Sequence, residues 1–175
     1  DIRDWFYIPS WKVSVLSRPA EAPGNIDEPW LVFIDNHGRG DALVDGWRNS
    51  GRPVAVVKQG QSFEKTGEFS YTVNPEQSDD YTALFEQLVK SGLEPATIVH
   101  MWTLEERDGG NDPLEWNRHA QGIGYYSVLN IARAIGRSGI QRDIRMEVVS
   151  NGIHAVAGQP VLNPEFSTVL GPVKI

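Results

Sequence analysis

The stretch that decides the fold is residues 30–43, which read Trp-Leu-Val-Phe-Ile-Asp-Asn-His-Gly-Arg-Gly-Asp-Ala-Leu. Its first five residues, Trp30 to Ile34, form an apolar run that is typical of a buried parallel strand. A turn rich in Asp, Asn and Gly follows, and a helical pattern begins at Asp41. Strand, glycine turn and helix in this order form the unit in which dinucleotide-binding proteins hold their cofactor. The sequence therefore predicts either a nucleotide-binding turn or a structural turn that has the same geometry and binds no nucleotide.

The rest of the chain alternates between strand and helix patterns. Apolar runs predict buried strands at 53–57, 96–101 and 144–149, the second of them central, and alternation predicts a half-buried strand at 69–73. Helices are expected at 41–49, 81–90, 116–135 and 163–170, with Ser78 or Asp79 and Asn163 as N-caps. The longest helix is expected to bury a stripe of Ile123, Tyr126, Leu129, Ile131, Ala132 and Ile135. Residues 58–67 are expected to form a polar turn and residues 103–116 an exposed loop.

These elements predict an α/β fold, a Rossmann-like, mostly parallel, doubly wound sheet of roughly five to seven strands. Residues 5–16 predict an additional extended N-terminal strand, and Pro9 suits an edge position. Trp5 and Trp11 on that strand are candidates for docking against a neighbouring domain. No internal boundary is visible, so residues 1–175 are expected to form a single domain.

Composition narrows the possible partners and compartments. Lys plus Arg is 16 and Asp plus Glu is 23, so the formal charge is 16 − 23 = −7, which argues against nucleic acid or an anionic membrane as a partner. The chain has no cysteine, which fits a reducing cytosol, so a cytoplasmic location is expected. No apolar run approaches the roughly 20 residues that span a bilayer. The N-terminus lacks the layout of a signal peptide and reads as a cut made inside a larger polypeptide.

The glycine turn itself is an incomplete cofactor motif. Gly38 and Gly40 match the first two glycines of G-x-G-x-x-G, but Leu43 occupies the third position. Asp35 and Asp41 place negative charge where a phosphate would lie. The second strand ends in Lys58, which could accept a 2′-phosphate, and not in the acid that binds a ribose. A structural turn is favoured, and an independent small nucleotide-binding protein or enzyme that uses the Gly38–Gly40 turn is the alternative.

Other candidate groups give no complete site. The four histidines, His37, His100, His119 and His154, have no metal-binding spacing, and His100 is expected to be a satisfied buried side chain. Ser150 ends a strand where a reductase serine could orient a carbonyl. The Tyr and Lys four residues apart that such enzymes need are absent, because Leu170 lies four residues before Lys174. An acidic stretch is expected to be a solvated loop: Glu105, Glu106, Asp108, Asp112 and Glu115. No catalytic, cofactor-binding or metal residue is therefore assigned.

Five segments resemble the ketoreductase region of modular type I polyketide synthases. They are Asp4-Trp-Phe-Tyr-Ile-Pro-Ser-Trp-Lys12, Ile98-Val-His-Met-Trp-Thr-Leu104, Gly124-Tyr-Tyr-Ser-Val-Leu-Asn-Ile-Ala-Arg-Ala-Ile-Gly136, Val148-Val-Ser-Asn-Gly152 and Val169-Leu-Gly-Pro-Val-Lys-Ile175. The resemblance covers nearly the whole chain, and the order and spacing of the segments are more specific than any one of them.

The resemblance implies that this chain is the structural half of such a ketoreductase, a degenerate short-chain dehydrogenase/reductase fold without cofactor. The adjoining half would bind NADPH and carry the catalytic residues. The parent would be a multidomain enzyme of secondary metabolite biosynthesis that reduces a β-ketoacyl group on an acyl carrier protein. The partners implied are the catalytic subdomain and neighbouring synthase domains of one longer chain, in which the catalytic half or an inserted enoylreductase follows Ile175.

Overall fold

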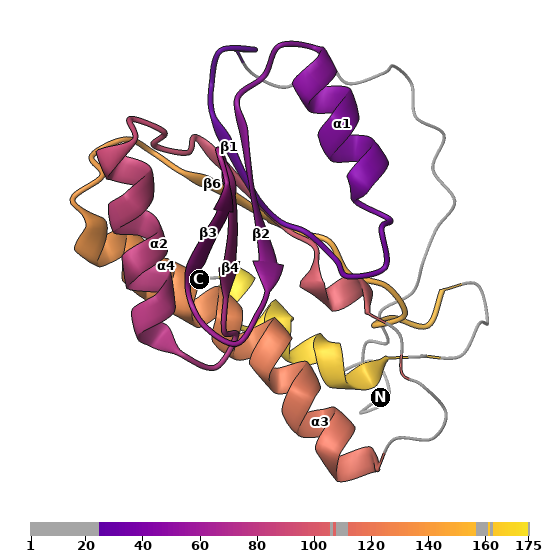
Figure 1. Cartoon of the computed structure of the whole chain (residues 1–175). Helices are drawn as coiled ribbons and strands as arrows, with labels where there is room; N and C mark the ends of the chain where they lie inside the picture. Colours follow the sequence, from indigo (N-terminus) through magenta and orange to yellow (C-terminus); the bar gives the residue numbers. More distant parts are fainter. Residues whose placement is uncertain (1–24, 106, 108–111, 157–160, 162, 175) are drawn as a thin grey trace, which may run out of the picture.

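The computed structural model describes residues 25–105, 107, 112–156, 161 and 163–174 (Figure 1). The expected N-terminal strand, with Trp5 and Trp11, lies outside the described residues, as do Glu106 and Asp108 of the acidic stretch. Within the described part, no helix is long and apolar enough to cross a membrane.

Six strands form one sheet in the order β3-β4-β2-β1-β5-β6. Their bounds are β1 Trp30–Phe33, β2 Val54–Gln59, β3 Glu64–Gly67, β4 Ser70–Val73, β5 Thr97–His100 and β6 Arg145–Val148. All neighbouring pairs are parallel except β3 and β4. The chain builds the sheet outward from β1 in one direction and then returns to its other side at β5. The predicted Rossmann-like, mostly parallel sheet is confirmed.

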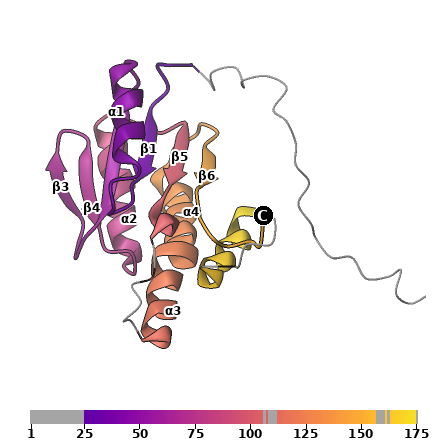
Figure 2. The same ribbon diagram turned by 90° about the vertical axis from the view of Figure 1, so that its right-hand side faces the viewer.

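The helices cover the two faces of the sheet unequally. Helix α1 (Asp41–Asn49) lies on one face, and α2 (Ser78–Lys90) and α4 (Ser127–Ser138) lie side by side on the other (Figure 1). Helix α3 (Pro113–Gln121) extends below the sheet (Figure 2). Three 3-10 helices complete the described elements: η2 Trp102–Leu104, η4 Pro164–Leu170 and η5 Pro172–Lys174.

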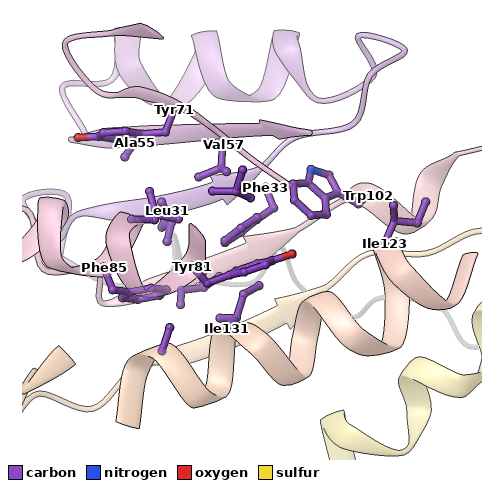
Figure 3. Close-up of a cluster of buried hydrophobic side chains, with 14 of the residues drawn as sticks. Leu31, Phe33, Ala55, Val57, Tyr71, Tyr81, Phe85, Trp102, Ile123 and Ile131 are labelled. Carbon is purple, nitrogen blue, oxygen red and sulfur yellow. The ribbon is translucent and has the colours of Figure 1, made fainter. Parts of the chain in front are cut away.

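Alternating strand residues fill two cores. One core, on the side of α2 and α4, contains the large buried rings of Phe33, Tyr81 and Trp102 (Figure 3). The ring centroids of Phe33 and Trp102 are 5.2 Å apart in an edge-to-face arrangement. The smaller core, under α1, is formed by the opposite sides of the same central strands with Val44. Strands buried on both faces explain the continuous apolar runs in the sequence.

Two expectations about the sheet edges are wrong. Residues 58–67 do not form only a turn, because Glu64–Gly67 is β3, an exposed edge strand paired antiparallel with β4. Residues 144–149 are not a buried strand: Arg145 and Glu147 of β6 are exposed while Met146 and Val148 are half-buried. Strand β6 pairs only with β5 in the described part of the chain, so one of its faces meets solvent.

The expected helix 116–135 is longer and interrupted by a π-helical turn, η3 (Gly122–Tyr126), between α3 and α4. The expected apolar stripe is therefore only partly correct beyond Ile123: Ile131 is buried as expected, but Tyr126 and Ala132 are exposed, and Ser127, Val128 and Asn130 are buried as well. A π-turn acts as a one-residue insertion and rotates everything after it by about 100°.

The expected N-caps are also corrected. Helix α2 begins after Gln77, which makes no side-chain capping bond, so neither Ser78 nor Asp79 is the cap. Asn163 precedes η4, but its amide donates to Asn151 Oδ1 at 3.1 Å and does not cap the helix. Asp112 is a true N-cap, because its carboxylate accepts a 2.9 Å hydrogen bond from the backbone of Leu114.

Candidate functional site

Open parallel sheets bind ligands at the carboxyl ends of the two strands between which the strand order reverses. In this sheet those strands are β1 and β5. The glycine turn follows β1 at this edge, and η2 follows β5. A dinucleotide in this crevice would need free backbone N–H groups at the start of α1.

Three N–H groups of the turn that leads into α1 are already taken by a carboxylate of the chain itself. Asp35, only 3% exposed, accepts hydrogen bonds from the backbone N–H groups of His37 at 3.1 Å, Arg39 at 3.1 Å and Gly40 at 2.7 Å. The carboxylate therefore sits at the positive end of α1, where a cofactor phosphate would bind in a working site. The donor set of this turn does not fit a second anion.

Gly40 is required for a close approach of the chain to itself. A Cβ atom at Gly40 would lie 2.8 Å from Ile34 Cγ1 and 3.1 Å from Met101 Sδ. Leu43, which occupies the third position of the glycine motif, is in contrast 48% exposed and is not packed into a tight contact between helix and sheet. Gly38 has a φ of +79°, a conformation that favours glycine. The local backbone therefore explains why glycine occupies both positions, without any role for a ligand.

A side-chain contact joins the glycine turn after β1 to the 3-10 helix η2 after β5. Arg39 Nη1 donates to the carbonyl of Leu104 at 3.4 Å, a long contact between the glycine turn and η2. Lys58 and Asp41 are exposed near the ends of β2 and the start of α1.

A second polar cluster lies beside this edge and was missed in the sequence. Glu105, half-buried after η2, accepts a hydrogen bond from His119 of α3, with Oε1 and Nε2 3.0 Å apart. Gln59, at the end of β2, donates to the other oxygen of Glu105 at 3.4 Å. The expectation that Glu105 belongs to a solvated loop is therefore wrong, whereas Asp112 and Glu115 are exposed.

The two partners shift each other's pKa. Burial raises the pKa of Glu105, but the hydrogen bonds of His119 and Gln59 and the charges of His119 and His37 hold it below its ordinary value. The hydrogen bond from Glu105 raises the pKa of His119, against the effect of burial, and the charges of Glu105 and Glu76 add to the increase. Each partner therefore favours the charged form of the other, and the hydrogen bond ties α3 to the loop after β5.

The remaining candidates do not combine into a reaction centre. His100 is fully buried, as expected, and is bonded through Nε2 to Ser127, while its Nδ1 has no hydrogen-bond partner among the residues that the structure describes. Ser150 follows β6 and is half-buried, and η4 offers it no tyrosine. Among the described residues no group of three His, Asp or Glu side chains could hold a metal ion.

This geometry defines a reductase-like Rossmann domain in which the Asp35 carboxylate binds the N–H groups of the glycine turn. The family model described as beta-ketoacyl synthase-like, N-terminal matches residues 28–171. The chain belongs to this beta-ketoacyl synthase-like, N-terminal family. No curated protein sequence matches the chain.

Solved structures place the fold among reductases. The chain is similar to a multidomain structure with adenylation, ketoreductase and pseudo-Asub parts from a keto acid-selecting NRPS module, at 25% identity and a TM-score of 0.75, over 89% of this chain and 13% of that one. It is also similar to an N-terminal ketoreductase from the macrolactin assembly line, at 20% identity and a TM-score of 0.58, over 69% of this chain and 24% of that one.

A third similar structure is the Bacillus cereus enoyl-acyl carrier protein reductase with NADP+ and indole naphthyridinone, at 14% identity and a TM-score of 0.59, over 84% of this chain and 65% of that one. The chain thus spans only 13% and 24% of the two ketoreductase-containing structures. The predicted relationship to the structural subdomain of a polyketide synthase ketoreductase region is confirmed.

Proposed function

We propose that the chain is the non-catalytic structural half of a polyketide synthase β-ketoreductase. It would support an adjoining half that binds NADPH and reduces β-ketoacyl groups carried by an acyl carrier protein in secondary metabolite biosynthesis. The chain would then be one part of a larger multidomain polypeptide, with the catalytic subdomain and other synthase domains as its neighbours. The observation that carries the proposal is the Asp35 carboxylate, which uses three N–H groups that a cofactor phosphate would need.

The filled crevice also supports a division of labour between the halves. The Asp35 carboxylate occupies N–H groups of the glycine turn, and the Arg39–Leu104 contact joins this turn to η2. Ser150 has no tyrosine in the following helix, so proton donation would have to come from the other half. This chain would contribute a folded sheet and a surface for packing, and no catalytic residue.

Isothermal titration calorimetry of the 175-residue chain with NADPH, and separately with NADH, tests the cofactor part of the proposal. We expect no binding tighter than about 1 mM, because a bound phosphate would have to displace or face the Asp35 carboxylate. Micromolar binding of NADPH that Lys58→Ala weakens toward the affinity for NADH would overturn the proposal. That result would favour the alternative of an independent nucleotide-binding protein.

The supporting role is tested in the parent chain. Asp35→Ala there should lower the thermal unfolding temperature of the ketoreductase while the KM for NADPH stays within about twofold, because this turn would not touch the cofactor. A large increase in KM without loss of stability would place the turn in the cofactor site and contradict the proposal.

A further inference from the structure

A groove of about 750 Å³ runs along the outer side of α3 and α4, away from the crevice at the sheet edge. It is lined by Glu76 and Ser78 before and at the start of α2, and by Leu114, Asn117, Arg118, Gln121, Gly122, Tyr126, Asn130 and Arg133. Figure 2 shows α3 continuing from α4 beyond the sheet, so that this flank stands clear of the core.

The π-helical turn is what aligns the two helices along one groove. Residues 114, 118 and 121 on α3 have the same spacing as residues 126, 130 and 133, which lie 126 − 114 = 12 positions later. In a straight α-helix a 12-residue offset would turn the second set by about 120°, and the one-residue insertion of a π-turn removes about 100° of this. Both sets therefore face the same way.

The groove carries apolar side chains that nothing in the described chain covers. Leu114 is 74% exposed and Tyr126 is 53% exposed, the two highest values among the large hydrophobic side chains described. The Tyr126 ring packs edge-to-face on Tyr125, with centroids 5.2 Å apart, which restricts its orientation. Two large apolar side chains that are exposed on one groove are typical of a surface that a macromolecular partner covers.

The charges in the groove point to an acidic partner. Arg118 and Arg133 are exposed, and neither makes a hydrogen bond or ion pair with another described residue. The groove holds one carboxylate, Glu76, against these two guanidinium groups, whereas the whole chain carries a formal charge of −7. Two unpaired arginines on an acidic chain are complementary to carboxylates brought by a partner.

We propose that this groove docks an acidic peptide segment, which places carboxylates on Arg118 and Arg133 and an apolar side chain between Leu114 and Tyr126. The exposed side-chain amide of Asn117 lines the same groove and can bond to the backbone of the segment. The inference is independent of the cofactor turn, since the groove shares no residue with it.

Selection from a random peptide display library tests the proposal, with the library first depleted on the Arg118→Gln/Arg133→Gln variant. We expect the selected peptides to be enriched in Asp and Glu next to Leu, Ile or Phe. Fluorescence anisotropy of one labelled selected peptide should then show binding that the double variant weakens about fivefold or more. Binding should also weaken as salt rises from about 20 mM to about 300 mM.

The matched control is Arg137→Gln, an exposed arginine on α4 that does not line the groove, and it should bind the peptide as the wild type does. Leu114→Ser should weaken binding without changing its salt dependence. Selected peptides without an acidic excess, no enrichment at all, or equal binding by the double variant would overturn the proposal. Self-association of the chain that the double variant abolishes, seen by sedimentation equilibrium, would assign the groove to a second copy and also overturn it.

Discussion

The Nε2 atom of His100 lies 2.8 Å from the Oγ atom of Ser127, a contact that joins β5 to the first residue of α4 inside the core. The serine Oγ also lies 2.6 Å from the carbonyl of Ile123 and 2.9 Å from that of Gly124, both in η3. The hydroxyl has one hydrogen, which it donates to these carbonyls, so the ring nitrogen must donate to the serine. One buried imidazole thus holds the π-helical turn against the sheet.

Ser127→Ala should destabilise the protein by about 1 to 3 kcal/mol, because it leaves Nε2 of His100 buried without an acceptor. Urea unfolding followed by tryptophan fluorescence measures the change. Ser78→Ala, at an exposed position, is the control and should change the free energy of unfolding by less than about 0.5 kcal/mol. Equal effects of the two substitutions would contradict the role assigned to Ser127.

His100 should remain neutral throughout the range in which the protein is folded. Burial lowers the pKa of its imidazole to about 3. The unfolded chain takes up a proton near the ordinary histidine pKa of about 6.5, so this residue should cost stability as pH falls from there toward 3. Nitrogen-detected NMR of the imidazole should show the Nε2–H tautomer without titration between about pH 5 and pH 8. A chemical-shift titration of His100 in that range would refute the assignment.

The Glu105–His119 pair should stabilise the fold most in mildly acidic solution. The folded pKa of His119 is raised, so its contribution is complete below the unfolded value of about 6.5 and is lost as pH rises through the folded value. The folded pKa of Glu105 is lowered, so its contribution is present above the unfolded value and is lost as pH falls. Both side chains are partly exposed, so the pair should contribute no more than about 1 kcal/mol.

Urea midpoints measured at a series of pH values check this window. His119→Gln should remove the loss of stability expected as pH rises above the unfolded histidine pKa of about 6.5. Glu115→Gln, which removes an exposed carboxylate from the same helix, should retain it. A His119→Gln variant with an unchanged pH profile would show that the pair contributes nothing measurable.

Asp35→Ala should cost at least about 2 kcal/mol, because three backbone N–H groups lose a charged acceptor at the start of α1. Asp41→Ala removes an exposed carboxylate from the first turn of the same helix and should cost only about 0.3 to 1 kcal/mol. Chemical denaturation of both variants gives the comparison. Similar losses would mean that the Asp35 bonds matter no more than the helix dipole.

Gly40→Ala should destabilise by about 1 to 3 kcal/mol, since the added methyl would meet Ile34 and Met101 in packed surroundings. Gly46→Ala is a matched control in α1, because its Cβ would have no atom within 4 Å. That substitution should stabilise by about 0.5 to 1 kcal/mol through the better helix propensity of alanine. Thermal unfolding of the two variants should therefore shift in opposite directions.

The sequence correctly predicted the strands and the helix whose apolar residues are repeated in a pattern set by burial in the core. Apolar runs located β1, β2 and β5, and the spacing of the helix that follows β1 located α1 at Asp41–Asn49. It failed at both sheet edges for one physical reason. That reason is that an edge strand has little burial to leave an apolar pattern. Strand β3 is exposed on both faces and therefore polar. Strand β6 was predicted to be buried, but its Arg145 and Glu147 side is exposed.

The site was harder to predict because its contacts join distant parts of the chain. Glu105 and His119 are separated by 14 residues and meet only because α3 turns back over the loop after β5. The sequence did place Asp35 where a phosphate would lie, but not the three hydrogen bonds that hold it there. The π-helical turn also has no periodic signature, so Tyr126 and Ala132 were predicted to be buried although they are exposed.

The Asp35 carboxylate has a thermodynamic consequence for a multidomain enzyme. A domain that binds a cofactor gains stability with the logarithm of the free ligand concentration and loses it when the ligand is scarce. A domain that supplies its own anion at the start of α1 has no such dependence, because the equivalent contact is intramolecular and always saturated. Under the proposed function, the folding of this chain would not depend on the cellular nucleotide pool, and its stability would stay the same while an adjoining half binds and releases its cofactor.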